Sequence, residues 1–352
     1  MANIAWAQSD ASVMDAAAAR KLYTEARSIY EAFERDHGGW IETKNGPMHY
    51  LRWNPSAGGL TLVWTHGTYD SAYSLTPVID ELNKLDIQVI AIDYYGHGQT
   101  PIPQHEVSIY HVADDMVALL NFLEVDKAVI GGHSRGGTIA SAFYDSYPAR
   151  VAGLILEDGG SSLTAHIWDN TSDEELNKRF ASIETSAAPT AYETEFDLFY
   201  DLVKSDNGTV DPESVYRVFS QCSEGEDRRW GYNRGLAQWL HEDKLANLLT
   251  LIRKPSNGPM FQYSTLSFNP LVAYRNLDVP MLVIDAVSEN DPYPTTEQTR
   301  QLAQMHPDLI EYQIWENTQH HAHYQHPLRF VKEVKSFLER VDNDRDLTVS
   351  NR

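Results

Sequence analysis

Short apolar runs that alternate with helical stretches constrain the fold of this chain more than any other feature. Each run is continuous rather than alternating, as expected for a strand that is buried on both faces of a parallel sheet. The pattern therefore predicts an α/β fold with a mostly parallel central sheet flanked by helices. The runs cover residues 60–64, 89–92, 128–130, 154–156, 281–284 and 310–314.

A helix and a hairpin are predicted before the first of these runs. Residues 11–37 place Leu22, Ala26, Ile29 and Phe33 on one helical face, and two glycines follow. Two short segments, 40–43 and 48–53, flank an Asn-Gly turn that is typical of a hairpin. The sequence leaves two alternatives for the helix, because it could pack on the catalytic core or on a second subunit in a homodimer.

The spacing of the runs indicates a large insertion. Between residues 156 and 281 the sequence shows no clear strand, but it has helical stretches at 173–183 and 195–203 and many aromatic residues. We therefore expect a mainly helical cap over the sheet. The predicted organisation is an N-terminal helical extension at 1–38, a core at 39–160 and 265–340, a helical cap at 161–264, and a flexible tail at 341–352.

Charge and cysteine content narrow the expected partners and environment. Lys and Arg total 28 against 50 for Asp and Glu, a formal net charge of -22, which argues against binding nucleic acid or anionic lipid. Cys222 is the only cysteine, so no intramolecular disulfide can form. No segment reads as a transmembrane span, and we expect no stable membrane insertion. The sequence leaves localisation open: it slightly favours the cytoplasm, and the alternative is secretion or the periplasm if a signal peptide was trimmed before Ala5-Trp6-Ala7.

The strongest chemical signal is the sequence Gly-His-Ser-Arg-Gly-Gly at 132–137. It follows an apolar run and precedes a helical stretch at 138–147, which is the strand–turn–helix context of a nucleophile elbow. Glycines two residues before and after Ser134 relieve crowding in the strained turn. Ser134 is therefore the predicted nucleophile.

A serine hydroxyl needs a base, usually a histidine oriented by a carboxylate. The segment after the run at 310–314 offers His320, His321 and His323, of which His320 is our choice. A metal site is the less favoured interpretation of these histidines. Asp291, after the run at 281–284, is the predicted acid, and Asp158, after the run at 154–156, is the alternative, with a cap or turn role as its structural interpretation.

Two further loops follow strands and complete the predicted site. Thr68 and Arg135 should supply the backbone N–H groups of an oxyanion hole, since one follows the first core strand and the other follows the nucleophile. The turn at 93–100 is interpreted as structural, and His97 within it as a structural rather than a catalytic histidine.

Together these motifs resemble the α/β-hydrolase superfamily, in the branch of capped esterases, lipases, lactonases and carbon–carbon bond hydrolases. The resemblance runs from about residue 40 to 338 and rests on His66-Gly67, the turn at 93–98, the Ser134 elbow, Asp291-Pro292 and the His320 region. Relatives commonly place a proline seven residues after the catalytic histidine, and Pro327 has that spacing from His320. They also place a glycine before that histidine, where this chain has Gln319.

The resemblance implies an acyl-enzyme mechanism. Ser134 attacks an acyl carbonyl, His320 shuttles the proton, Asp291 holds the imidazole, and the amides of Thr68 and Arg135 bind the oxyanion. No metal and no organic cofactor are implied. The expected substrate is a small-molecule ester or lactone with an apolar or aromatic acyl group, and short soluble acyl chains are favoured because acidic stretches interrupt the insertion.

Alternative functions remain on the same scaffold. One is hydrolysis of a carbon–carbon bond beside a ketone, and another is a non-catalytic receptor or scaffold, which the intact set of triad residues disfavours. The side chain of Arg135 has two interpretations as well. It could pair with a nearby carboxylate, or it could attract an acidic substrate.

Overall fold

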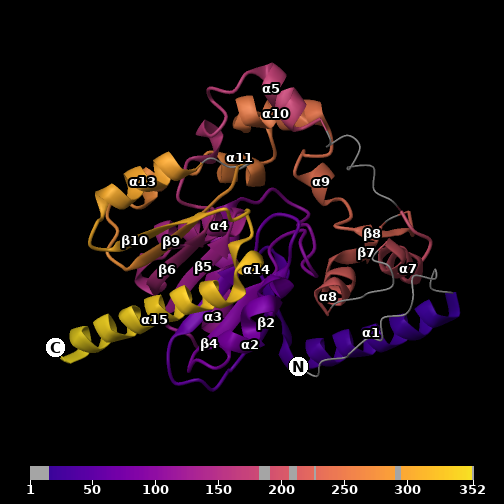
Figure 1. Cartoon of the computed structure of the whole chain (residues 1–352), viewed down its shortest axis with the longest axis horizontal. Helices are drawn as coiled ribbons and strands as arrows, with labels where there is room; N and C mark the ends of the chain where they lie inside the picture. The colour runs from indigo at the N-terminus through magenta and orange to yellow at the C-terminus, as the bar shows by residue number, and fades with distance from the viewer. Residues whose placement is uncertain (1–15, 182–190, 206–211, 226, 290–294, 351–352) are drawn as a thin grey trace.

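The computed structural model describes residues 16–181, 191–205, 212–225, 227–289 and 295–350 (Figure 1). Its centre is an eight-stranded sheet in the order β1-β2-β4-β3-β5-β6-β9-β10. The β1–β2 and β2–β4 pairs are antiparallel, and every other neighbouring pair is parallel. The predicted mostly parallel sheet is thus confirmed. The strands are β1 (Gly38–Thr43), β2 (Gly46–Trp53), β3 (Thr61–Thr65), β4 (Gln88–Ile92), β5 (Ala128–His133), β6 (Val151–Glu157), β9 (Met281–Val287) and β10 (Ile310–Glu316).

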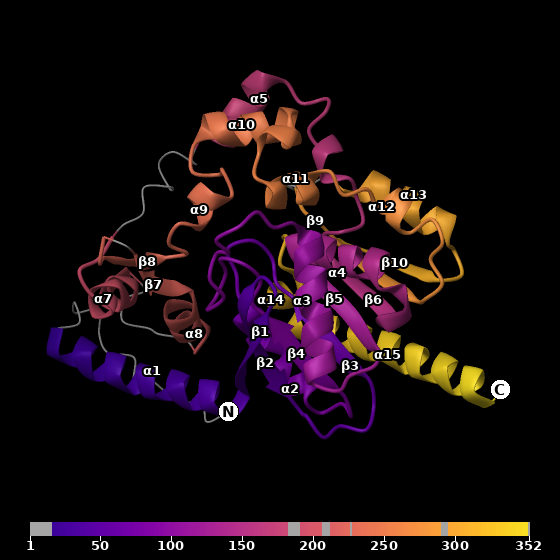
Figure 2. The same ribbon diagram turned by 180° about the vertical axis from the view of Figure 1, so that it is seen from behind.

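Helices cover both faces of this sheet. The helices α2 (Thr76–Leu82) and α15 (Pro327–Ser350) lie on the face toward the viewer in Figure 1. The helices α3 (Ile109–Phe122) and α4 (Arg135–Ser146) lie on the other face, which Figure 2 brings to the front. The other helical elements of the core are η1 (Ala72–Leu75), η2 (Pro148–Arg150), α12 (Pro270–Ala273), α13 (Thr296–Met305) and α14 (Ala322–Gln325).

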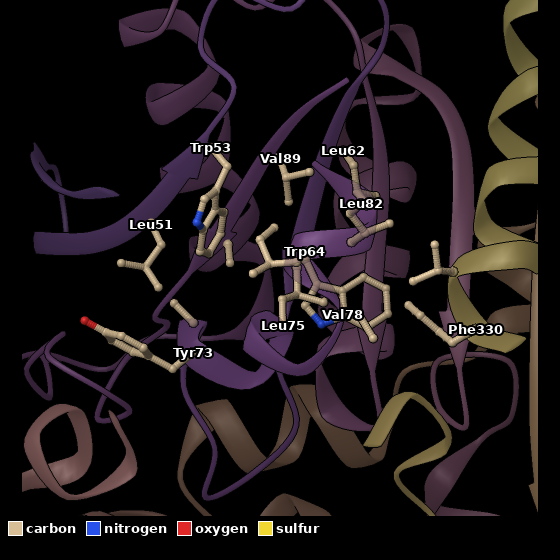
Figure 3. Close-up of a cluster of buried hydrophobic side chains, with 14 of the residues drawn as sticks. Leu51, Trp53, Leu62, Trp64, Tyr73, Leu75, Val78, Leu82, Val89 and Phe330 are labelled. Atoms are coloured by element: carbon tan, nitrogen blue, oxygen red, sulfur yellow. The ribbon is translucent and has the colours of Figure 1, made fainter. Parts of the chain in front are cut away.

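Alternate residues of each strand feed two separate hydrophobic cores, which explains why the apolar runs are continuous. In β3, Leu62 and Trp64 belong to the core beneath α2 and α15, whereas Val63 belongs to the core beneath α3 and α4. Figure 3 shows the first core, where Trp64 lies near Val78 of α2 and Phe330 of α15. This two-sided burial fixes the position of the strand ends that carry the functional residues.

The segment between β6 and β9 is mainly helical, but it also contains a short hairpin that the sequence did not predict. The hairpin pairs β7 (Cys222–Glu224) with β8 (Trp230–Tyr232). Strands of three residues are too short to show a two-residue period, so no sequence pattern identified them. The helical elements are η3 (Thr164–His166), α5 (Asp173–Arg179), α7 (Glu195–Ser205), α8 (Pro212–Gln221), α9 (Leu236–Trp239), α10 (Leu245–Arg253), η4 (Pro255–Asn257) and α11 (Met260–Leu266).

The N-terminal helix α1 (Ala16–His37) packs on its own chain, and the predicted homodimer stays a prediction. In both views it runs beneath α7 and α8 (Figures 1 and 2). Tyr23 makes edge-on ring contacts with Phe196 and Phe199 of α7, and Arg27 Nη1 donates to Glu195 Oε1 at 2.8 Å. The helix therefore joins part of the insertion to the edge of the central sheet. Residues 11–15 of the predicted helix lie outside the described residues.

The flexibility predicted for the tail at 341–352 stays a prediction, and the structure places residues 341–350 in a helix. The helix α15 continues to Ser350, although most residues from Asp342 onward are polar. Its earlier turns pack Phe330, Phe337 and Val341 into the core, so the last turns extend an already formed helix. Among the described residues, no helix is long and apolar enough to span a membrane.

A buried polar network ties α1 to the sheet. His49 of β2 is completely buried, and its Nδ1–H donates to Asp93 Oδ2 at 2.7 Å. Its Nε2 lies 3.2 Å from Glu34 Oε2 of α1. Burial alone would lower the pKa of His49, but its hydrogen bonds and charge interactions with Asp93 and Glu34 raise that pKa to about 9.

This raised pKa predicts that the protein loses stability at alkaline pH. Because the histidine binds its proton more tightly when folded, the stabilisation is complete below about pH 6.5 and is lost as the pH rises through about 9. We expect the free energy of unfolding to fall by on the order of 3 kcal/mol over this range. Denaturant titrations of wild type and His49→Gln between pH 6 and 10 measure this decrease in the free energy of unfolding. Parallel pH profiles of the two proteins would contradict the assignment.

Candidate active site

Ser134 lies in a sharp turn between β5 and α4, as the sequence predicts for a nucleophile elbow. Its backbone has φ 54° and ψ -121°, a strained conformation for a residue other than glycine. The turn requires close backbone approach on both sides. A Cβ on Gly132 would lie 2.3 Å from the Gly136 carbonyl carbon, and one on Gly136 would lie 2.0 Å from the Thr65 oxygen. Glycine at these two positions therefore permits the turn.

The Ser134 hydroxyl, the His320 ring and the Asp158 carboxylate form a continuous hydrogen-bonded relay. Ser134 Oγ lies 2.8 Å from His320 Nε2, and His320 Nδ1 lies 2.6 Å from Asp158 Oδ2. A proton on Nδ1 donates to the carboxylate, which leaves Nε2 free to accept the serine proton. Asp158 is almost fully buried, and the His320 side chain is 18% exposed. The relay therefore opens toward solvent at the histidine and serine.

The carboxylate in this relay is Asp158, which the sequence offered only as the alternative to Asp291. Asp158 directly follows β6, and its own N–H donates to Ile284 O of the adjacent strand β9 at 2.8 Å. Its Oδ1 also accepts from the Ala286 amide at 3.4 Å. These contacts with β9 hold Asp158 at the carboxyl end of β6, beside His320. Asp291 lies outside the described residues, so its predicted role stays a prediction.

The other two candidate histidines have different surroundings from His320. The His323 ring is completely buried, and its Nδ1–H donates to both carboxylate oxygens of Glu157, at 2.8 and 2.7 Å. Burial opposes charge on the His323 ring, but Glu157 raises its pKa overall. The His321 ring stacks on Tyr324. In the described ranges, no three His, Cys, Asp or Glu side chains are grouped so that they could hold a metal ion.

His133 links the elbow to the loop that carries the base. Its Nε2–H donates to the carbonyl oxygen of His320 at 2.8 Å. Burial, together with the neighbouring histidines, holds the pKa of His133 well below its usual value, so the ring is neutral. The sequence predicts no role for His133 or Glu157, although they are adjacent to Ser134 and Asp158. Neither contact has a local sequence signature, because each joins segments more than 160 residues apart.

Thr68 and Arg135, the residues predicted to form the oxyanion hole, both line the cavity above Ser134, and their role stays a prediction. Thr68 follows β3, and Arg135 is the first residue of α4, so its amide is among those without a partner inside the helix. Both residues line the same cavity as Ser134 and His320. The positive end of α4 is also directed at this position, which favours developing negative charge.

The side chain of Arg135 pairs with a carboxylate, the simpler of its two predicted roles. Its Nη2 donates to Glu242 Oε1 at 2.9 Å. Burial alone would lower the pKa of Arg135, but the Glu242 carboxylate raises it overall, so the guanidinium stays charged. The pair is close to neutral, which weakens the case for attraction of an acidic substrate.

The turn after β4 has the structural role predicted for it. Asp93 is fully buried and accepts hydrogen bonds from the amides of Ala72 and Gln99, at 2.6 and 3.0 Å. His97 is also buried, and its Nδ1–H donates to Tyr95 O at 2.9 Å. Burial keeps the pKa of His97 well below its usual value.

A cavity of about 1960 Å³ lies above Ser134, between the sheet edge and the insertion. Its walls are mixed in character. Apolar side chains come mainly from the region of α5 and α10, and polar ones mainly from the region around β7, β8 and α9. The first group includes Ile167, Trp168, Phe180, Leu248, Leu251 and Ile252, and the second includes Gln221, Asn233, Arg234, Gln238 and Glu242.

Comparison with known sequences gives a consistent result. A family model described as alpha/beta hydrolase fold matches residues 61–327. Among curated proteins, the chain is 34% identical over 102 residues to an uncharacterized protein of Mycobacterium tuberculosis (strain ATCC 25618 / H37Rv). This match covers 29% of the chain and 30% of the relative, so the chain spans less than a third of the length of that protein.

Solved structures are similar over most of their length. E-2-(acetamidomethylene)succinate hydrolase is 17% identical, with a TM-score of 0.59 and coverage of 86% of this chain and 98% of that structure. A structure from a study of carboxylesterases of the archaeon Nitrososphaera gargenis is 17% identical, with a TM-score of 0.58 and coverage of 87% and 100%. At these identities the similarity shows the fold alone.

Proposed function

The chain belongs to the α/β-hydrolase fold family, and from that premise we propose that it is a serine hydrolase of carboxylic esters or lactones. The observation that carries this proposal is the relay from Ser134 through His320 to Asp158 at the floor of a large cavity. A histidine placed to take a proton from serine, and itself oriented by a buried carboxylate, is the arrangement that acyl transfer requires.

In the proposed mechanism, Ser134 Oγ attacks the acyl carbonyl while its proton moves to His320 Nε2. The amides of Thr68 and Arg135 stabilise the negative oxygen of the tetrahedral intermediate. The intermediate collapses when His320 returns the proton to the leaving alcohol, which leaves an acyl group on Ser134. Water then attacks that ester with His320 as the base, and the acid product departs. Asp158 stabilises the imidazolium form of His320 in both halves of the reaction.

The cavity supports a substrate that is partly apolar. Its apolar wall includes Trp168, Phe180 and Ile252, which suits an apolar or aromatic acyl group. Other aromatic residues of the insertion pack elsewhere; Phe199 and Phe219, for example, lie in the core against α1. The aromatic content of the sequence therefore overstates the aromatic character of the cavity.

Two substrates tested side by side separate ester hydrolysis from its main alternative. One is p-nitrophenyl butyrate and the other is a vinylogous diketone acid, the kind of compound that carbon–carbon bond hydrolases cleave. Our proposal predicts turnover of the ester with kcat/KM in the enzymatic range of about 10⁴ M⁻¹s⁻¹ or more, and little cleavage of the diketone. Preferential cleavage of the diketone would replace the proposal with the carbon–carbon alternative.

We also predict a preference for short acyl chains. Polar groups such as Gln221 and Arg234 line part of the cavity, and methylenes that reach them gain little from leaving water. The butyrate ester should therefore have a kcat/KM at least about tenfold above that of the palmitate ester, a difference of about 1.4 kcal/mol in transition-state binding. Faster turnover of emulsified long-chain triglyceride would contradict this prediction.

A further inference from the structure

Glu242 makes three side-chain contacts around the mouth of the candidate oxyanion hole. It lies in the segment between α9 and α10, and its amide donates to Ala237 O at 2.8 Å. Tyr69 Oη donates to Glu242 Oε2 at 2.8 Å, and Arg135 Nη2 donates to Glu242 Oε1 at 2.9 Å. Gln262 of α11 donates to the same Oε1 at 2.5 Å. One carboxylate of the insertion thus joins two loops of the core.

The two core residues that Glu242 holds are next to the two oxyanion amides. Tyr69 directly follows Thr68, and Arg135 carries the second amide on its own backbone. Tyr69 and Ser134 both have positive φ angles, 60° and 54°, so the backbone at each loop is strained and needs support from its surroundings. Fixing the side chains of Tyr69 and Arg135 therefore restricts the direction of the N–H groups.

Burial makes the Arg135–Glu242 contact difficult to replace. The two side chains are 9% and 15% exposed, and a charged group at such depth needs a partner. Loss of the carboxylate would leave the guanidinium without its counter-charge beside the nucleophile. Arg135 would then reorient, and its backbone with it.

We propose that Glu242 is a positioning residue through which the cap insertion holds the oxyanion hole in its active geometry. This inference rests on the proposed acyl-transfer function. Glu242 does not touch the reacting atoms in this account; it acts through Tyr69 and Arg135. Docking of the insertion on the core and formation of the active oxyanion hole are consequently coupled.

The test compares Glu242→Ala with Asp173→Ala. Asp173 is a matched control because it is also a carboxylate of the insertion paired with an arginine, Arg253, at 2.9 Å, but it is exposed and contacts neither core loop. Steady-state kinetics with p-nitrophenyl butyrate should show kcat reduced about 10²-fold in Glu242→Ala, with KM changed less than about threefold, because the contact acts on the transition state. Asp173→Ala should match wild type.

A second readout avoids turnover. The rate at which a fluorophosphonate labels Ser134 depends on the same hole, so labelling of Glu242→Ala should be slowed by a similar factor. Tyr69→Phe, which removes one contact and no charge, should lower kcat severalfold at unchanged KM. This variant tests the proposal if Glu242→Ala does not fold.

Three results would overturn the inference. If wild type is active and the Glu242 and Tyr69 variants match Asp173→Ala, the contact has no positioning role. If KM rises while kcat is unchanged, Glu242 binds substrate instead. If wild type neither hydrolyses esters nor labels, the proposed function itself fails, and the inference fails with it.

Discussion

Replacing Ser134 by alanine is expected to reduce kcat for a short-chain ester by about 10⁴- to 10⁶-fold, with little change in KM. The proposed acyl-enzyme forms on this hydroxyl, which lies 2.8 Å from His320 Nε2, the group that takes its proton. Substrate binding should persist because the cavity walls are untouched. The variant should also fold normally, since the change removes a single atom.

Ser141→Ala is the matched control for this experiment. Ser141 lies in α4, about two turns beyond Ser134, and its hydroxyl donates to Gly137 O at 2.7 Å. It does not line the cavity that contains Ser134. Its loss should change the turnover per folded molecule only severalfold. A Ser134→Ala protein that keeps more than about a hundredth of the wild-type kcat would contradict the nucleophile assignment.

The second large effect is expected from replacing the carboxylate that orients His320. We expect Asp158→Asn to reduce kcat by on the order of 10⁴-fold, because an amide no longer stabilises the imidazolium and favours the wrong tautomer of His320. Asp158 is 1% exposed and lies 2.6 Å from His320 Nδ1, so water does not replace the lost charge. KM should change little, since the carboxylate does not contact substrate.

Asp291→Asn provides the decisive comparison, since Asp291 is the acid predicted from sequence. Because Asp158 contacts His320, we expect the Asp158 variant to lose more activity than the Asp291 variant. The opposite order, with Asp158→Asn within about tenfold of wild type and Asp291→Asn strongly impaired, would return the role to Asp291. Circular dichroism and thermal melts establish that both variants are folded.

The parts of this protein that local sequence predicts well are those with local causes. The elbow at Ser134 follows from a strand, a turn with glycines and a helix within about twenty residues, and the structure has each of them. The parallel strands were identified because burial on both faces makes each run apolar throughout. The hairpin of β7 and β8 was missed because segments of three residues carry no periodic signal.

The identity of the carboxylate that orients His320 cannot be predicted from the sequence pattern alone. Asp158 follows β6, and the loop that carries Asp291 follows β9. These strands are parallel neighbours in the sheet, so their carboxyl ends lie side by side. Either position satisfies the pattern of strand followed by aspartate, and the contact between Asp158 and His320 is evident only in three dimensions. Glu242 is a similar case, because its contacts with Tyr69 and Arg135 join residues 107 or more positions apart.

The proposed function requires Ser134 to be an activated nucleophile, and active-site labelling tests this requirement most directly. Folded protein is treated with a fluorophosphonate, its intact mass is measured, and the modified peptide is mapped. We predict one adduct per chain, located on Ser134, formed rapidly in wild type and at least about 10²-fold more slowly in His320→Ala, because the histidine activates the serine. An adduct on another residue, or no adduct in folded wild-type protein, would contradict the account.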